Sequence, residues 1–182
     1  MKTLRKGAVL ALLAAMGAGA ASAATHATKV SSGVDFTCAI VAGAAWCWGG
    51  NANGQLGNNS LIPGNQPAQV VGLSSGVSAI SASGFHACAV VNGAAKCWGA
   101  NTSGQLGNNS TAPSLVPVQV AGLTSGVTAI ATGFDHSCAI VNGAVMCWGA
   151  NLGYGQLGDG TSNPSSVPVW VSGITGGATA LS

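Results

Sequence analysis

Residues 88–107 read CAVVNGAAKCWGANTSGQLG, and the rest of the chain repeats this pattern. The upstream copy, residues 38–57, reads CAIVAGAAWCWGGNANGQLG, and the downstream copy, residues 138–158, reads CAIVNGAVMCWGANLGYGQLG. The first cysteines of the three copies, Cys38, Cys88 and Cys138, are 50 residues apart. A fixed period near 50 residues is typical of propellers and other stacked repeats. The 182-residue chain is therefore predicted to be an array of repeated units.

Each unit carries signals for four short strands separated by turns. Glycine, asparagine and proline interrupt short runs of β-branched and apolar residues, and no segment has the apolar period of a helix. The first strand is predicted at residues 77–82 and 127–132, and the last strand is predicted to begin at a proline, at residues 67–71, 117–120 and 168–171. The sequence thus predicts an all-β fold of blades with four antiparallel strands. The expected units are residues 27–76, 77–126 and 127–177, and residues 178–182 are expected to begin a further blade.

The tight turn at the centre of each unit predicts a disulfide. Asn-Gly at residues 92–93 and 142–143 favours a two-residue type I′ turn, in which both turn residues have positive φ. Counting outward from this turn places the two cysteines of a unit opposite each other, as a non-hydrogen-bonded pair with Cα atoms about 4.5 Å apart. The first unit departs from the pattern because Ala42 replaces the asparagine, and alanine disfavours positive φ. The predicted disulfides are Cys38–Cys47, Cys88–Cys97 and Cys138–Cys147.

A tryptophan follows the second cysteine in every unit, at Trp48, Trp98 and Trp148. The strands around it are apolar on both faces, so each sheet needs a cover on both sides, and these side chains are predicted to pack between neighbouring blades. Propellers close with about 4–8 blades. Three units are therefore expected to be an incomplete propeller, either a fragment of a longer one or half of a six-blade homodimer, and the sequence favours the fragment because residues 178–182 begin a strand and then stop.

The N-terminal residues have the pattern of a secretory signal. Lys2, Arg5 and Lys6 precede an apolar run, and the small residues 21–23 (Ala-Ser-Ala) form a cleavage site. Residues 1–23 are thus a predicted signal peptide, with residues 24–182 secreted or periplasmic and no membrane segment after cleavage. The remaining chain holds two lysines against three aspartates. A chain so poor in basic residues is not expected to bind nucleic acid.

Residues 125–158, SGVTAIATGFDHSCAIVNGAVMCWGANLGYGQLG, resemble the repeat of the regulator of chromosome condensation family. They also resemble its secreted bacterial branch, the propeller-type β-lactamase inhibitory proteins, through the SGV-A-I, H-x-x-A, WG-x-N and GQ elements. The resemblance covers about residues 27–182 and implies a β-propeller, with seven blades in well-known members. The chain departs from this pattern in its paired cysteines and in having only three units.

The histidines are the main candidates for chemistry. His86 and His136 occupy the position held by Phe36 in the first unit. A metal site of His86 with Cys88 and Cys97 is the alternative to the disulfide. A hydrolase or lyase using His86 or His136 with Asp135 is the enzymatic alternative, but the chain offers it no positioned nucleophile and no acid pair. We therefore expect no catalytic residue, no cofactor and no metal.

The expected function is that of a secreted, non-catalytic scaffold that binds an unidentified protein through propeller loops. Binding anchors are often exposed aromatic residues at positions where the units differ. The candidate contacts are Trp46, Tyr154 and Trp170, with the loops at residues 58–66, 108–116 and 159–167 around them. Trp46 and Trp170 have an alternative role in covering the outer faces of the terminal units. Guanine-nucleotide exchange is the alternative function that the family resemblance implies.

Overall fold

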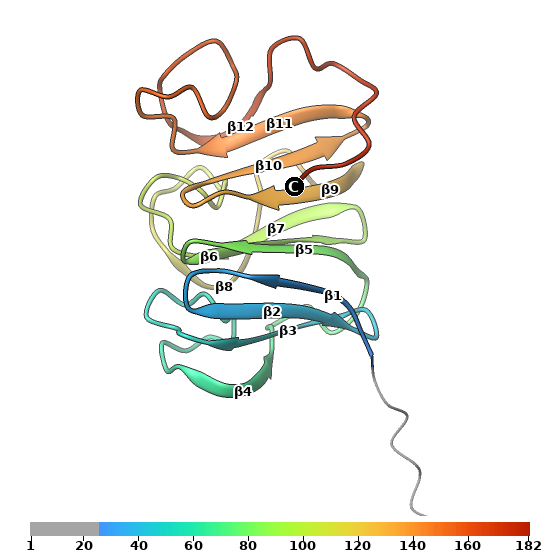
Figure 1. Ribbon diagram of the computed structural model, residues 1–182, viewed down its shortest axis with the longest axis vertical. Helices are drawn as coiled ribbons and strands as arrows, with labels where there is room; N and C mark the ends of the chain where they lie inside the picture. The colour runs from blue at the N-terminus through green and yellow to red at the C-terminus, as the bar shows by residue number, and fades with distance from the viewer. Residues whose placement is uncertain (1–25) are drawn as a thin grey trace, which may run out of the picture.

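The computed structural model describes residues 26–182, so the predicted signal peptide lies outside the described part of the chain. The described residues form three four-stranded antiparallel sheets, stacked one on another (Figure 1). The first sheet contains β1 (Ala27–Ser32), β2 (Phe36–Val41), β3 (Ala44–Gly49) and β4 (Gly64–Gln69). The second contains β5 (Val77–Ser83), β6 (His86–Val91), β7 (Ala94–Gly99) and β8 (Ser114–Gln119), and the third contains β9 (Val127–Thr132), β10 (His136–Val141), β11 (Ala144–Gly149) and β12 (Ser165–Trp170). Each sheet is one repeat unit with its strands in chain order, which confirms the predicted all-β blades.

The central hairpin of each unit has the predicted turn and register. Asn92 and Gly93 have φ of 50° and 79°, and Cys88 lies opposite Cys97 in the β6–β7 ladder. All three predicted disulfides are present, with Cα–Cα distances of 4.1 Å in the first unit and 4.0 Å in the other two. Closing a loop of this length stabilises a fold by roughly 2–3 kcal/mol in the chain-entropy model. Each blade is therefore fastened across its two central strands.

The turn of the first unit adopts the same conformation despite its alanine. Ala42 has a φ of 51° and Gly43 a φ of 76°. The left-handed region costs an ordinary L-residue about 1 kcal/mol or more, and asparagine less. We expect Ala42→Asn to raise the free energy of unfolding by roughly 1 kcal/mol. Urea denaturation measures this change, and the reciprocal variant Asn92→Ala should lose a similar amount; a neutral Ala42→Asn would contradict the argument.

The last strand of each unit begins earlier than predicted. β4, β8 and β12 start three residues before Pro67, Pro117 and Pro168, so each proline lies inside a strand rather than at its start. The ladder passes from Cys47↔Ala68 to Gly49↔Gly64 and skips the residues around Pro67. A proline is tolerated there because the strand lies at the edge of its sheet and the irregular pairing needs no amide donor.

Residues 178–182, which the sequence predicts to begin a further blade, form no strand within the described chain. Their path starts like that of a first strand, because the Ala178 amide donates to the Gly143 carbonyl as the Val77 amide does to Gly43. Within the described residues no second strand lies on the open side of this segment. Without such a partner its backbone forms no ladder.

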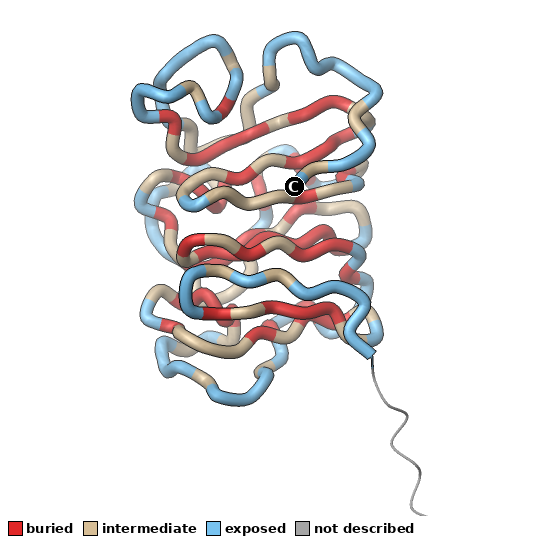
Figure 2. The backbone as a smooth tube through the Cα atoms, viewed as in Figure 1, coloured by how far each residue is buried: buried red, intermediate tan, exposed pale blue. Residues whose placement is uncertain are grey.

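The hydrophobic cores lie between the sheets. Figure 2 shows buried residues along the central strands, with exposed residues concentrated in the loops. Trp98 and Trp148 are completely buried, and their indole nitrogens donate to the carbonyls of Gln55 and Gln105 in the preceding unit, both at 2.9 Å. The predicted packing of these tryptophans between blades is therefore confirmed. Trp48 is only partly buried, because no unit precedes it in the described chain.

Candidate functional site

The strands end at two rims with different contents. We call one the loop rim: it comprises the corners at residues 33–35, 84–85 and 133–135 and the long loops at residues 50–63, 100–113 and 150–164. The opposite turn rim comprises the hairpin turns and the connections between units (Figure 1). On the loop rim, the Gly50 amide donates to the Asp35 carbonyl at 2.8 Å and joins loop to corner. The predicted loops lie on this rim, although their last three residues belong to β4, β8 and β12.

A buried asparagine organises each long loop. In the second unit, the side-chain amide of Asn101 donates to the carbonyls of Ser110 and Ala112, both at 2.9 Å. Its oxygen accepts the Leu106 amide at 2.9 Å, and Asn51 and Asn151 make the equivalent bonds in their own units. These asparagines belong to the repeated WG-x-N element, but the sequence did not reveal their partners. Loops held in this way present their exposed side chains at low entropic cost.

The exposed apolar side chains concentrate on the loop rim. Six of the ten large hydrophobic residues that are exposed in the described chain lie there: Val34, Leu61, Ile62, Phe134, Leu152 and Tyr154. Tyr154 is the most exposed of them, at 89%. The corners bring further apolar groups together, since Phe85 and Phe134 pack edge to face with ring centroids 6.1 Å apart. Exposed apolar residues concentrated on one rim are typical of an interaction surface.

The loop rim is also acidic. Asp35, Asp135 and Asp159 are the only acidic residues in the sequence, and all three lie in its corners and loops. The Thr161 amide donates to Asp159 at 3.0 Å, and this backbone hydrogen bond is the main cause that lowers the pKa of the Asp159 carboxyl. The lysines of the described chain, Lys29 and Lys96, lie on β1 and β7 instead. The rim therefore combines apolar groups with negative charge.

The structure places the three predicted contact residues apart. Tyr154 lies on the loop rim, whereas Trp170 ends β12 near the turn rim, opposite Met146. Trp46 lies on the uncovered face of the first unit, where it helps to line a hollow of about 520 Å³. These residues therefore do not form one site, because Tyr154 and Trp170 lie at opposite ends of the third unit and Trp46 lies on the first.

Sequence reasoning missed three of the exposed apolar residues on the loop rim, Val34, Phe134 and Leu152, whereas Leu61 and Ile62 lie within the predicted loop at residues 58–66. The available signal was variation between units. Phe134 stands where the other units have Val34 and Gly84, and Leu152 stands where they have Ala52 and Thr102. Only Tyr154 was singled out by its position in the one unit that has an extra residue.

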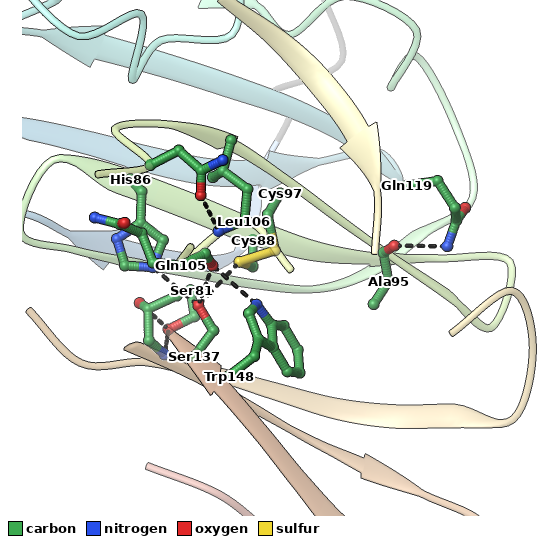
Figure 3. The surroundings of a disulfide bond; sticks show 12 residues. Ser81, His86, Cys88, Ala95, Cys97, Gln105, Leu106, Gln119, Ser137 and Trp148 are labelled. Carbon is green, nitrogen blue, oxygen red and sulfur yellow. Dashed lines mark hydrogen bonds between the residues drawn. A yellow bond between two sulfur atoms is a disulfide. The ribbon is translucent and has the colours of Figure 1, made fainter. Parts of the chain in front are cut away.

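The structure also shows a serine–histidine pair that the sequence did not suggest. His86 Nε2 lies 2.9 Å from Ser137 Oγ across the junction of the second and third units (Figure 3). Ser137 donates its hydroxyl proton to the Gln105 carbonyl at 3.0 Å, so His86 is assigned as the Nε2–H donor rather than as a base. Burial, with a smaller contribution from His136, lowers the pKa of His86 to about 3. Both side chains are completely buried, which denies a substrate direct access to the pair.

The other chemical alternatives gain little from the geometry. Cys88 and Cys97 are joined in a disulfide, so neither is available as a thiolate ligand beside His86. Among residues 26–182, no group of three or more histidine, cysteine, aspartate or glutamate side chains is arranged to hold a metal ion. His136 is half-buried, and burial lowers its pKa more than Asp135 raises it. This histidine is thus mainly neutral at neutral pH.

The comparisons with known proteins agree with the repeat pattern. The model of the regulator of chromosome condensation (RCC1) repeat matches residues 42–90 and 92–140, which is more than half of the chain. No curated protein matches the chain.

Similar solved structures include yeast RCC1 (Prp20) bound to Kap60, with a TM-score of 0.71, 18% identity, and coverage of 80% of this chain and 37% of that chain. Prp20p from Saccharomyces cerevisiae, described with its binding properties to Gsp1p and histones, has a TM-score of 0.71 and 20% identity, covering 80% of this chain and 38% of that chain. Human WBSCR16 has a TM-score of 0.70 and 24% identity, covering 81% and 38%. The chain therefore spans less than two fifths of the length of these structures, and at these identities the likeness concerns the fold alone.

Proposed function

Because the chain belongs to the regulator of chromosome condensation (RCC1) repeat family, we propose that it is a non-catalytic module that binds another protein through its loop rim. The observation that carries this proposal is the set of exposed apolar side chains on the loop rim. Leu152 and Tyr154 lie on the loop that the buried Asn151 holds in place, and Phe134 lies in the neighbouring corner against Phe85. Aromatic side chains on rigid supports are typical binding anchors, since they bury a large area at a low entropic cost.

The chemistry of the rim indicates what kind of partner surface it would accept. The apolar cluster favours an apolar patch on the partner, and the three aspartates favour basic residues at the border of that patch. Complementary charge of this kind mainly raises the association rate and excludes wrong partners. We therefore expect binding to weaken moderately with salt and to depend chiefly on the apolar contacts.

Export is part of the proposal. The predicted signal at residues 1–23 directs the chain out of the cytosol, and the three disulfides fit an oxidising extracellular or periplasmic environment. In residues 26–182 no helix is long and apolar enough to cross a membrane.

A narrower form of the proposal takes the bound protein to be a β-lactamase, as the resemblance to the secreted inhibitory branch implies. Yeast Prp20, which was solved with Kap60 and described with its binding to Gsp1p and histones, supports a protein-binding role for the fold. Guanine-nucleotide exchange remains the alternative that the family offers. The predicted export and the low charge of the chain argue against this alternative. The shared fold does not support it by itself, because a fold does not determine a function.

Site-specific photo-crosslinking in the exported chain tests the proposal. A photo-reactive phenylalanine analogue at position 154 should cross-link one discrete protein, because this side chain points outward from the rim. The matched control carries the analogue at position 170, another exposed aromatic position near the opposite rim, and should give no such product. Cross-linking from position 170 alone, or none from either position, would contradict the proposal.

The enzymatic alternative is tested with the purified chain and a panel of ester, peptide and glycoside substrates. We expect no turnover above that of a denatured sample. A hydrolytic rate that His136→Ala abolishes without unfolding the protein would replace the binding proposal with an enzymatic one.

A further inference from the structure

The stack of sheets ends in two uncovered apolar faces that differ from each other. We call the face of unit 1 that carries Trp46 and Trp48 the front face, and the opposite face of unit 3, around Ile140 and Val145, the rear face. Val30 on the front face is 57% exposed, whereas Ile80, at the same position of the second unit, is completely buried. This difference arises because a preceding unit covers the second sheet and none covers the first.

The two junctions inside the chain show what covers a front face. In each junction the rear face of one unit packs against the front face of the next. A tryptophan on that front face donates its indole N–H to the main-chain carbonyl of a glutamine in the preceding unit. At the two ends of residues 26–182 the same groups lack these partners. No unit precedes Trp48 within these residues, and the main chain of Gln156 occupies the position of the accepting Gln55 and Gln105 carbonyls.

A second pair of positions indicates that the two free faces match each other. In the second junction His86 pairs with Ser137. The same positions of the first junction hold Phe36 and Ala87, which are buried in one apolar cluster. Each junction thus joins two polar or two apolar groups.

The free faces carry His136 and Thr37 at these positions. A junction between them would again join an imidazole to a hydroxyl. The Thr37 hydroxyl already lies 3.2 Å from Ser32 Oγ on its own face, and a facing imidazole would add a second hydrogen bond to it.

We propose that two copies of the chain associate through these faces, the rear face of each copy covering the front face of the other. Two equivalent contacts close a ring of six blades, which lies within the usual range of about 4–8 blades. The contact is heterologous, and its closure prevents growth into an open polymer. Each contact would repeat the packing already present twice in the chain, with Trp48 donating to the Gln156 carbonyl of the other copy.

The last residues of the chain compete with this contact. Ala178 and Leu181 pack against the cluster of the rear face, at the positions that Ala27 and Val30 of an incoming β1 would take. Residues 178–182 are held by one backbone hydrogen bond outside the sheets, which the Ala178 amide donates to the Gly143 carbonyl at 2.9 Å. An incoming β1 must displace residues 178–182, so deleting them should strengthen association.

Light scattering of the purified chain over a range of concentrations tests the proposal, with circular dichroism to verify that each variant is folded. We expect a mass of two copies at high concentration and dissociation on dilution. Trp48→Ala should weaken association by about tenfold or more, whereas Tyr154→Ala on the loop rim should leave it unchanged. Deletion of residues 178–182 should shift the equilibrium toward two copies.

The polar pair provides a sharper test. Thr37→Ala leaves His136 without its acceptor in the other copy, and His136→Phe removes the hydrogen bond that the other copy donates to Thr37, so each single change should weaken association about fivefold or more. The double variant recreates the Phe36–Ala87 pair of the first junction and should recover most of this loss.

Several results would overturn the proposal: a single-copy mass at every concentration, a mass that grows without limit, an unchanged equilibrium in Trp48→Ala, or a double variant no better than the single ones.

Discussion

Replacing Trp148 with alanine is expected to lower the free energy of unfolding by roughly 3–5 kcal/mol. This side chain is completely buried between the second and third sheets, and its indole donates to the Gln105 carbonyl at 2.9 Å. The substitution removes a large apolar area and leaves both a cavity and a carbonyl that has lost one of its donors. Urea denaturation monitored by circular dichroism measures the change.

Trp48→Ala is the matched control for this experiment. It removes the same side chain from the same position of a repeat, but from a face that no preceding unit covers. At concentrations low enough for the protein to be a single copy, the loss of stability should be well below that of Trp148→Ala. Equal losses in the two variants would contradict the view that the cores lie between the units.

The second large effect is a loss of stability in acid. Burial lowers the pKa of His86 to about 3 in the folded protein, while the unfolded chain binds a proton near pH 6.5. Below pH 6.5 the unfolded state therefore takes up a proton that the folded state does not. Stability falls by up to about 1.4 kcal/mol per pH unit, and the loss approaches roughly 5 kcal/mol near pH 3. Above pH 6.5 this histidine contributes no pH dependence.

The variant His86→Phe/Ser137→Ala isolates this effect. It places the Phe36–Ala87 pair of the first junction in the second junction, so the packing has a precedent within the same protein. Urea denaturation at pH 7, 5.5 and 4 should show a much flatter profile for the variant than for the natural chain. Parallel profiles would assign the acid sensitivity to other groups, such as the half-buried His136.

Local features of the fold were predictable because they depend on residues close in sequence. Asn92 and Gly93 determine the turn, the turn determines the register, and the register brings Cys88 opposite Cys97. The predicted start of β4 was wrong because the true start depends on where a 14-residue loop (residues 50–63) rejoins the edge of the sheet. No local signal around Pro67 reveals that the ladder skips there.

The candidate site was less predictable because it depends on how the units stack. His86 and Ser137 are 51 residues apart, and their contact exists only where one blade meets the next. Stacking likewise brings Phe85 to Phe134 at the corners. Tyr154 was identified by the extra residue of its unit, whereas Trp46 and Trp170 were selected as aromatic residues at positions where the units differ, which says nothing about which surface a strand presents.

The dissociation constant of the complex with the protein cross-linked at position 154 tests the central claim most directly. Calorimetry would compare the natural chain with Phe134→Ala and Tyr154→Ala on the loop rim and with Trp170→Ala near the turn rim. We predict that each change on the loop rim weakens binding about tenfold or more, and that Trp170→Ala leaves it within about twofold. Unchanged affinity in both loop-rim variants, or a loss confined to Trp170→Ala, would contradict binding through the loop rim.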